Sequence, residues 1–259
     1  MNKKIQRTNK IIEILKEKNG ASVKELAKIL NVSEMTIRRD LKVLNSNNIV
    51  TNVYGATIYN PSNTINNMSF NYDINTEIIK FENEKDKIGA AAAKLINNND
   101  VIIIDTGTTT EKLAYSIDNN LEITALFYNV NILNALRKKK NIKMIFSGGY
   151  YHPNTEMFES PEGISLIENT RATKVFVSAA GVHESLGVTC SNNYEVATKK
   201  AILKSSYEKI LLLHSEKFGK VHSSYFAELQ EFNTIITDNR LSSQWIDKIK
   251  ALNINLILV

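Results

Sequence analysis

The chain has 259 residues, of which 43% are hydrophobic, and it carries a formal net charge of +5. This length allows a small module of about 60 residues beside an α/β domain of about 180, and the hydrophobic content excludes a wholly disordered chain. No apolar run approaches the roughly 20 residues that span a bilayer, and the N-terminus lacks the unbroken apolar core of a signal peptide. The single cysteine, Cys190, excludes an intrachain disulfide and a cysteine-based zinc site. We therefore expect a cytoplasmic protein with no membrane partner, no metal and no cofactor.

The positive charge is concentrated at one end of the chain. Residues 1–58 hold 11 Lys and Arg and five Asp and Glu, a net charge of +6, whereas the remaining residues have a net charge of −1. This asymmetry indicates a polyanionic partner for the N-terminal end. A basic module that is merely soluble would have the same charge.

Residues 1–58 have the pattern of a winged helix-turn-helix domain. Apolar residues at helical spacing predict a first helix that ends near Asn19-Gly20. Ser22-Val-Lys-Glu25 is a capping box that opens a second helix, and after a short break Ser33 is expected to cap a third. The apolar face of the third helix is expected to be Ile37, Leu41 and Leu44. The run 49–58 then predicts a two-stranded ribbon, or wing, that turns near Gly55.

The opposite face of the third helix is polar and basic. In a helix-turn-helix, short polar and Arg side chains of this helix reach base edges, and its N-terminus lies at a phosphate. The alternative is a three-helix protein–protein module whose arginine pair is solvated. DNA binding explains more of the features together, and the residues expected at the DNA are Ser33, Thr36, Arg38, Arg39 and Lys42.

The rest of the chain divides into a linker, residues 59–76, and a second domain, residues 77–259. The linker is rich in Asn and Ser and shows no sustained period. A helix at about 77–96 is expected to begin the second domain, where alternation of apolar β-branched runs with helical patterns predicts an α/β fold with a mostly parallel sheet. The expected strands are 101–104, 123–127, 142–146, 175–177, 210–213, 234–236 and 254–259, and the further helices lie at about 109–118, 130–139, 162–168, 194–206 and 242–251.

Ligands of such sheets bind beyond the carboxyl ends of the strands. The first strand leads into Asp105-Thr-Gly-Thr-Thr-Thr110 and a helix, which predicts either a phosphate cradle or an ordinary N-cap turn. Glu195 and Lys199 have the spacing of a routine surface ion pair. Lys217 follows another strand and could complete a phosphate site, although taken alone it is expected to be solvated. A dinucleotide site is disfavoured because the chain has no G-x-G-x-x-G motif.

The run from Arg7 to Thr57, with VKELAKILNVSEMTIRRDLKVL at its centre, resembles the DNA-binding domain of the DeoR family of bacterial sugar-metabolism regulators. Ser33-Glu-Met-Thr-Ile-Arg-Arg-Asp-Leu41 matches the family's signature almost position by position. The wing is a poorer match, because the family usually has Arg and His where this chain has Asn52 and Tyr54. Residues 77–240 resemble the family's sensor domain, which is related in fold to ribose-5-phosphate isomerase and the coenzyme A transferases.

The resemblance implies a transcriptional regulator, most simply a repressor of a carbohydrate-metabolism operon, that responds to a phosphorylated sugar or related metabolite. The family usually has Gly-Ala-Asp-Gly where this chain has Ser178-Ala-Ala-Gly181, and Asp-Ser-Ser-Lys where it has His214-Ser-Glu-Lys217, so the effector site is expected to be atypical. The resemblance gives effector-binding roles to Asp105, Gly107, Thr108, Thr109, Glu195, Lys199 and Lys217.

Two other functions compete with this interpretation. One is a sugar-phosphate isomerase or transferase that carries a DNA-binding arm, and the other is a structural adaptor that binds no small molecule. A regulator that reads operator DNA generally needs two half-sites. We therefore expect a homodimer or higher even oligomer, with Ile254–Val259 as a candidate contact.

Overall fold

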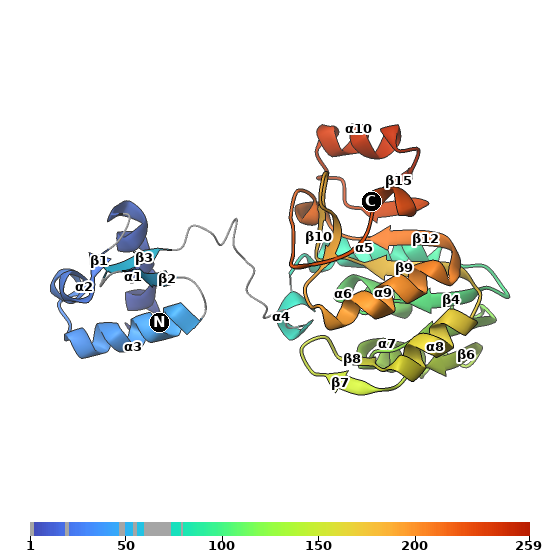
Figure 1. Ribbon diagram of the computed structural model, residues 1–259, viewed down its shortest axis with the longest axis horizontal. Coiled ribbons are helices and arrows are strands. Elements are labelled where there is room, and N and C mark those ends of the chain that lie inside the picture. Colours follow the sequence, from blue (N-terminus) through green and yellow to red (C-terminus); the bar gives the residue numbers. More distant parts are fainter. Residues whose placement is uncertain (1–2, 19–20, 47–49, 54–55, 60–73, 79) are drawn as a thin grey trace. The chain divides into compact units, whose positions relative to one another are not determined.

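The computed structural model describes residues 3–18, 21–46, 50–53, 56–59, 74–78 and 80–259. The chain divides into two compact units, Met1–Ser69 and Phe70–Val259 (Figure 1). Of the segment 59–76 expected as a linker, residues 60–73 lie outside the described residues, Tyr59 ends a strand and 74–76 belong to a helix. Among the described residues no helix is long and apolar enough to cross a membrane.

The N-terminal unit consists of three helices and a small antiparallel sheet. The helices are α1 (Lys3–Lys18), α2 (Val23–Leu30) and α3 (Glu34–Ser46), and the sheet has the order β1-β3-β2, with β1 (Ala21–Ser22), β2 (Val50–Val53) and β3 (Ala56–Tyr59). The pairing of β2 with β3 confirms the ribbon predicted for the wing, although the turn near Gly55 lies outside the described residues. The strand β1 was not predicted, because it has only two residues and the second, Ser22, opens the capping box of α2.

Local hydrogen bonds explain the turn between α2 and α3. The Ser22 hydroxyl accepts the Glu25 amide at 3.2 Å and the Glu25 carboxylate accepts the Ser22 amide at 2.8 Å, so the predicted capping box is confirmed. Asn31 ends α2 in the left-handed conformation, with φ 50°. Ser33 then accepts the amide of Thr36 at 3.2 Å and opens α3. The buried face of α3 is the predicted one, Ile37, Leu41 and Leu44.

The C-terminal unit is built on a seven-stranded sheet in which every neighbouring pair is parallel. This confirms the predicted α/β class. The strand order is β15-β14-β12-β9-β4-β5-β6. The bounds are β4 (Val101–Ile104), β5 (Ile123–Phe127), β6 (Ile142–Phe146), β9 (Ala172–Ser178), β12 (Ser206–Leu212), β14 (Thr234–Thr237) and β15 (Asn255–Leu258).

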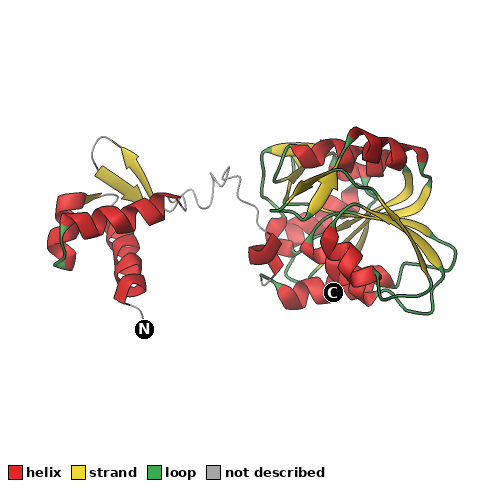
Figure 2. Cartoon of the chain, turned by 90° about the horizontal axis from the view of Figure 1, so that it is seen from below, coloured by secondary structure: helices red, strands yellow, loops and turns green. Residues whose placement is uncertain are grey.

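Helices cover both faces of this sheet (Figure 2). Alternate residues of each strand point to opposite faces: Ile102 and Ile104 of β4 pack with α5 (Glu82–Ala93), α6 (Thr108–Ser116) and α7 (Val130–Leu136). Ile103 packs on the other face. That face is covered by α8 (Pro161–Asn169), α9 (Tyr194–Lys204) and α10 (Ser243–Ala251).

Two features of this unit differ from the expectation. The single helix expected at 77–96 is two helices, α4 (Ile74–Ile78) and α5, because Phe81 adopts a left-handed conformation with φ 54°. The chain also forms short antiparallel strands that were not predicted: the hairpin of β7 (Tyr150–His152) and β8 (Met157–Glu159), and the sheet of β10 (Gly181–His183), β11 (Gly187–Cys190) and β13 (Ser224–Ala227). Strands of three or four residues are too short for a period of two to stand out in sequence.

Candidate functional site

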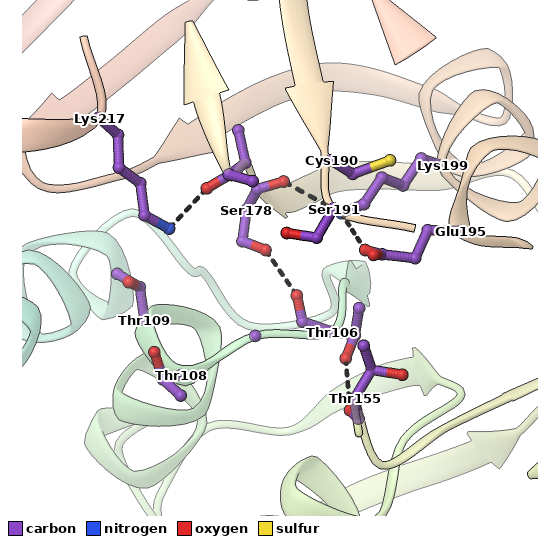
Figure 3. Close-up of a pocket in the computed structure, with 13 residues that line it drawn as sticks. Thr106, Thr108, Thr109, Thr155, Ser178, Cys190, Ser191, Glu195, Lys199 and Lys217 are labelled. Carbon is purple, nitrogen blue, oxygen red and sulfur yellow. Dashed lines mark hydrogen bonds and ion pairs between the residues drawn. The ribbon is translucent and has the colours of Figure 1, made fainter. Parts of the chain in front are cut away.

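The strand order of the parallel sheet reverses direction between β4 and β9. From β4 the chain proceeds outward through β5 and β6, whereas β9, β12, β14 and β15 extend in the other direction. Such a switch point leaves a crevice beyond the carboxyl ends of the two central strands. A cavity lies there, lined by Thr106, Gly107, Thr108, Thr109, Thr155, Ser178, Ala179, Ala180, Cys190, Ser191, Glu195, Lys199 and Lys217 (Figure 3). The fold therefore brings six of the seven expected effector residues together; Asp105 does not line the cavity.

The loop 106–110 forms one wall of the cavity and leaves donors free. Gly107 has φ 144°, and a Cβ there would lie 2.6 Å from the Ser178 hydroxyl, so only glycine fits. The first hydrogen bond within α6 runs from the Glu111 amide to the Gly107 carbonyl, which leaves the amides of Thr108 and Thr109 unused by the helix. Among the described residues their hydroxyls have no partner either. This arrangement suits an anion at the positive end of a helix.

Asp105 lies beneath the cavity and is fully buried. It accepts the Tyr128 hydroxyl, the Ser178 amide at 2.9 Å and the Lys199 ammonium at 2.5 Å. Burial opposes the charge of Lys199, but Asp105 and Glu195 outweigh it and raise the pKa of Lys199. This arrangement makes Asp105 the group that orients Lys199 and the end of β9, rather than a group that contacts a ligand.

Glu195 and Lys199 do not form the surface pair expected from their spacing. Both are buried, and their charged atoms are 3.8 Å apart at the inner wall of the cavity. The Glu195 carboxylate accepts the amide and the side chain of Asn192, at 3.0 and 2.8 Å. Burial raises the pKa of Glu195, which makes its carboxylate a stronger hydrogen-bond acceptor for a hydroxyl than a solvated glutamate.

Lys217 is also not the solvated lysine expected for it taken alone. It ends the 3₁₀ helix Ser215–Lys217 after β12, and its ammonium group donates to the Ala179 carbonyl at 2.6 Å. Burial lowers the pKa of Lys217 to about 8. In Figure 3 Lys217 reaches the cavity from the side opposite Glu195. Its hydrogen-bond acceptor is neutral, so its charge is available to an anion.

The departures from the family pattern fall in different places. Ala180 lines the cavity and supplies no acid. His214 does not line it: the ring is buried, stacks on Phe81 with 4.2 Å between centroids, and burial lowers its pKa to about 3. Glu216 is exposed. The departures at Ser178 and Ala180 therefore change the lining of the cavity, whereas those at His214 and Glu216 do not.

Several residues near the site were not predicted. Thr155 comes from the tip of the β7–β8 hairpin and accepts the Thr106 hydroxyl through its carbonyl, at 3.1 Å. Ser178 donates to the Thr106 carbonyl at 2.6 Å. Lys85 of α5 is fully buried, and its ammonium group donates to the Glu77 carbonyl. The sequence does not distinguish Lys85 from its neighbours, because it lies in a run of charged residues that predicts a solvated helix face.

The residues expected at DNA lie together on α3 and are accessible. Arg38, Arg39 and Lys42 are exposed, Thr36 is half-buried, and Ser33 is exposed at the helix start. Arg38 lies 3.5 Å from Glu34 in an exposed pair. Apart from the buried Val50, the side chains of β2 and β3 lie outside the described residues.

Arg7, another basic residue of this unit, stabilises the fold through an ion pair with Asp40. Asp40 of α3 is buried, and the Arg7 guanidinium contacts it at 2.6 Å. Arg7 therefore fastens α1 to α3, and its charge is neutralised within the unit.

A helix-turn-helix with exposed basic residues, followed in one chain by an α/β domain with a cavity at its switch point, is typical of a DNA-binding regulator with a ligand-sensing domain. Residues 7–63 match the DeoR-like helix-turn-helix domain, and residues 80–239 match the DeoR C terminal sensor domain. The chain belongs to the DeoR family. It is thus a transcriptional regulator and not an enzyme.

Similar proteins extend over most of this chain. It is 32% identical to the HTH-type transcriptional regulator GolR of Listeria innocua, over 92% of this chain and 91% of that protein. It is 30% identical to the Deoxyribose operon repressor of Escherichia coli, over 90% of each chain. It is 33% identical to the Lactose phosphotransferase system repressor of Staphylococcus epidermidis, over 91% of this chain and 92% of that protein. Among solved structures, ribose 5-phosphate isomerase A from Methanocaldococcus jannaschii aligns with a TM-score of 0.39 and 15% identity, over 54% of this chain and 56% of that one.

Proposed function

We propose that this protein represses a carbohydrate-metabolism operon in the cytoplasm and that a phosphorylated sugar or related metabolite relieves the repression. The cavity at the switch point carries the proposal: free amides and hydroxyls at the start of α6 face the ammonium group of Lys217. The names of two similar proteins, the Deoxyribose operon repressor and the Lactose phosphotransferase system repressor, agree with a sugar-linked signal.

In the proposed complex the phosphate lies at the start of α6. The amides of Thr108 and Thr109 and the Lys217 ammonium donate to it, because helix N-termini and lysines both favour phosphate oxygens. Glu195, at the inner wall beside Lys199, accepts hydrogen bonds from sugar hydroxyls. Asp105 and Gly107 act indirectly: the first holds Lys199, and the second lets the loop approach Ser178.

Operator binding is assigned to the exposed face of α3. Thr36, Arg38 and Arg39 lie in the N-terminal half of the helix, which enters the major groove in helix-turn-helix complexes. Ser33 and Lys42 are assigned to phosphates. Two half-sites require two such helices, so the functional form is proposed to be a homodimer or higher even oligomer. The strand β15, paired on one side only, is a candidate contact between copies.

A screen of phosphorylated sugars against the full-length chain tests the proposal. A ligand at 100 times its dissociation constant adds about 2.7 kcal/mol to the free energy of unfolding, which a thermal melt detects. The same ligand should release a fluorescent operator fragment in an anisotropy assay. If the protein binds its operator but no phosphorylated metabolite stabilises it, the adaptor function is supported instead.

A further inference from the structure

Two lysines line opposite sides of the cavity and are held by different contacts. Lys199 is ion-paired with Asp105, whereas Lys217 is bonded to a neutral carbonyl.

A second lysine, Lys85, is fully buried and is held by a carbonyl in the same way. Lys85 donates to the Glu77 carbonyl at the end of α4, and burial lowers its pKa to about 8. One turn along α5, a Cβ on Gly89 would lie 2.6 Å from the backbone of Lys112 and Leu113, so α5 and α6 touch backbone to backbone. Lys85 also contributes to the lowered pKa of Lys217. Lys85 does not itself line the cavity. Phe81, one turn before it, stacks on His214 with 4.2 Å between ring centroids, so the start of α5 lies beside the segment that carries Lys217. Lys85 and Lys217 thus both have neutral carbonyls as acceptors on this side of the site.

Helix α4 is fastened at both ends to this region. At its start the buried Ile74 donates its amide to the Asn154 carbonyl at 2.9 Å, next to Thr155, whose carbonyl accepts the Thr106 hydroxyl. At its end the Glu77 carbonyl accepts Lys85. In sequence, α4 is the first described element after residues 60–73, which lead from the DNA-binding unit.

We propose that Lys85 is a further effector ligand, and that its turn from the Glu77 carbonyl to the effector's phosphate releases the end of α4. This rests on the proposed function of the cavity. Two forces act in the same direction. The ammonium group prefers a dianion to a neutral carbonyl, and the Glu77 carboxylate, which lies close enough to Lys217 and Lys85 to feel their charges, is repelled by the incoming phosphate. Effector binding would thereby change the contacts of α4, which follows residues 60–73 in the chain.

Hydrogen exchange of the wild-type full-length chain, with and without inorganic phosphate, tests the inference. Phosphate should raise the exchange rate of peptides that cover 74–80 by roughly tenfold to a hundredfold, the size expected for losing one hydrogen bond to a charged donor. The same samples are followed by thermal melts. Stabilisation by phosphate with unchanged exchange at α4 overturns the release of α4 and leaves the proposed effector site intact. If neither phosphate nor any sugar phosphate stabilises the chain, the effector site and this inference fail together.

Two variants separate the role of Lys85 from a general effect of charge. Lys85→Met keeps the length of the side chain and removes its donor, so α4 should exchange rapidly without phosphate and show no further change with it. Lys87→Met, an exposed lysine of the same helix, should behave as wild type. Phosphate-induced exchange at α4 that persists in Lys85→Met overturns the inference. If Lys85→Met does not fold, the wild-type measurement decides alone.

Discussion

Lys199 of α9 donates to Asp105 at the end of β4 over 2.5 Å, with both side chains buried. The pair fastens the helix that carries Glu195 to the strand that carries the threonine loop. Because Asp105 also accepts the Ser178 amide, one carboxylate holds three segments that meet at the cavity. The Asp105–Lys199 pair therefore fixes the positions of the segments that line the cavity.

Replacing Asp105 should cost stability before it affects binding. Asp105→Asn leaves the buried Lys199 charge uncompensated, and we expect a loss of about 3–5 kcal/mol in the free energy of unfolding, measured by urea denaturation. The exposed Asp247→Asn should change it by less than about 0.5 kcal/mol. The double variant Asp105→Asn/Lys199→Met should recover part of the loss. Equal stability of the single variant and wild type would contradict a structural role for the pair.

Replacing Lys217 should weaken binding of the effector and leave binding of the operator unchanged. Lys217→Met removes one charge-assisted hydrogen bond, which corresponds to a roughly 10- to 100-fold higher effector Kd. Operator affinity should be unchanged, since the DNA contacts lie in the other unit. The exposed neighbour Lys220, changed to Met, serves as control in the same calorimetric titration. An unaltered response to effector in Lys217→Met would remove Lys217 from the site.

Effector affinity should depend on pH through Lys217. Its pKa of about 8 in the free protein means that the ammonium form, which binds phosphate, predominates below pH 8 and is lost above it. We expect Kd to rise by up to about tenfold for each pH unit above 8, until it reaches the roughly 10- to 100-fold loss expected for Lys217→Met. Lys217→Arg keeps its charge throughout this range and should show a shallower dependence. Identical wild-type Kd values at pH 7 and pH 9 would refute the assignment.

His214 should make the fold sensitive to acid. Burial lowers its pKa to about 3, whereas the unfolded chain titrates near 6.5. Between these values the unfolded state binds the extra proton, so stability is fully present above pH 6.5 and falls with pH by up to about 1.4 kcal/mol per unit. Urea denaturation of His214→Gln between pH 7 and pH 4 should show a smaller decline than wild type. Parallel declines in the two proteins would exclude His214 as the cause.

Arg39 should be needed for operator recognition. It is exposed on α3, and if it pairs with a guanine, Arg39→Ala costs about 1–3 kcal/mol of binding and relaxes specificity there. Binding should also weaken steeply with salt as counterions are released. Arg137→Ala, an exposed arginine of the sensor unit, is the matched control in electrophoretic mobility shifts. Wild-type affinity and selectivity in Arg39→Ala would rule out this contact.

Local and periodic features of this protein could be predicted from the amino-acid sequence. The Ser22–Glu25 capping box and the buried face Ile37, Leu41 and Leu44 follow from short-range hydrogen bonding and a period of 3.6, and both are observed. The parallel class of the larger domain follows from the alternation of apolar runs and helices. The threonine loop was located as well, because a strand end, a glycine and a helix start are adjacent in the chain.

Which charged side chains are buried, and what they contact, could not be predicted without the three-dimensional structure. Lys199 meets Asp105 94 positions away, so spacing within α9 suggested the wrong partner and the wrong exposure. Lys85 and Lys217 look like solvated lysines in sequence. In the structure the Lys85 ammonium donates to the Glu77 carbonyl in α4, and the Lys217 ammonium donates to the Ala179 carbonyl just after β9. The physical reason is that burial and charge pairing depend on which strand ends and helix starts the sheet order brings together, and short-range pattern carries no information on that order.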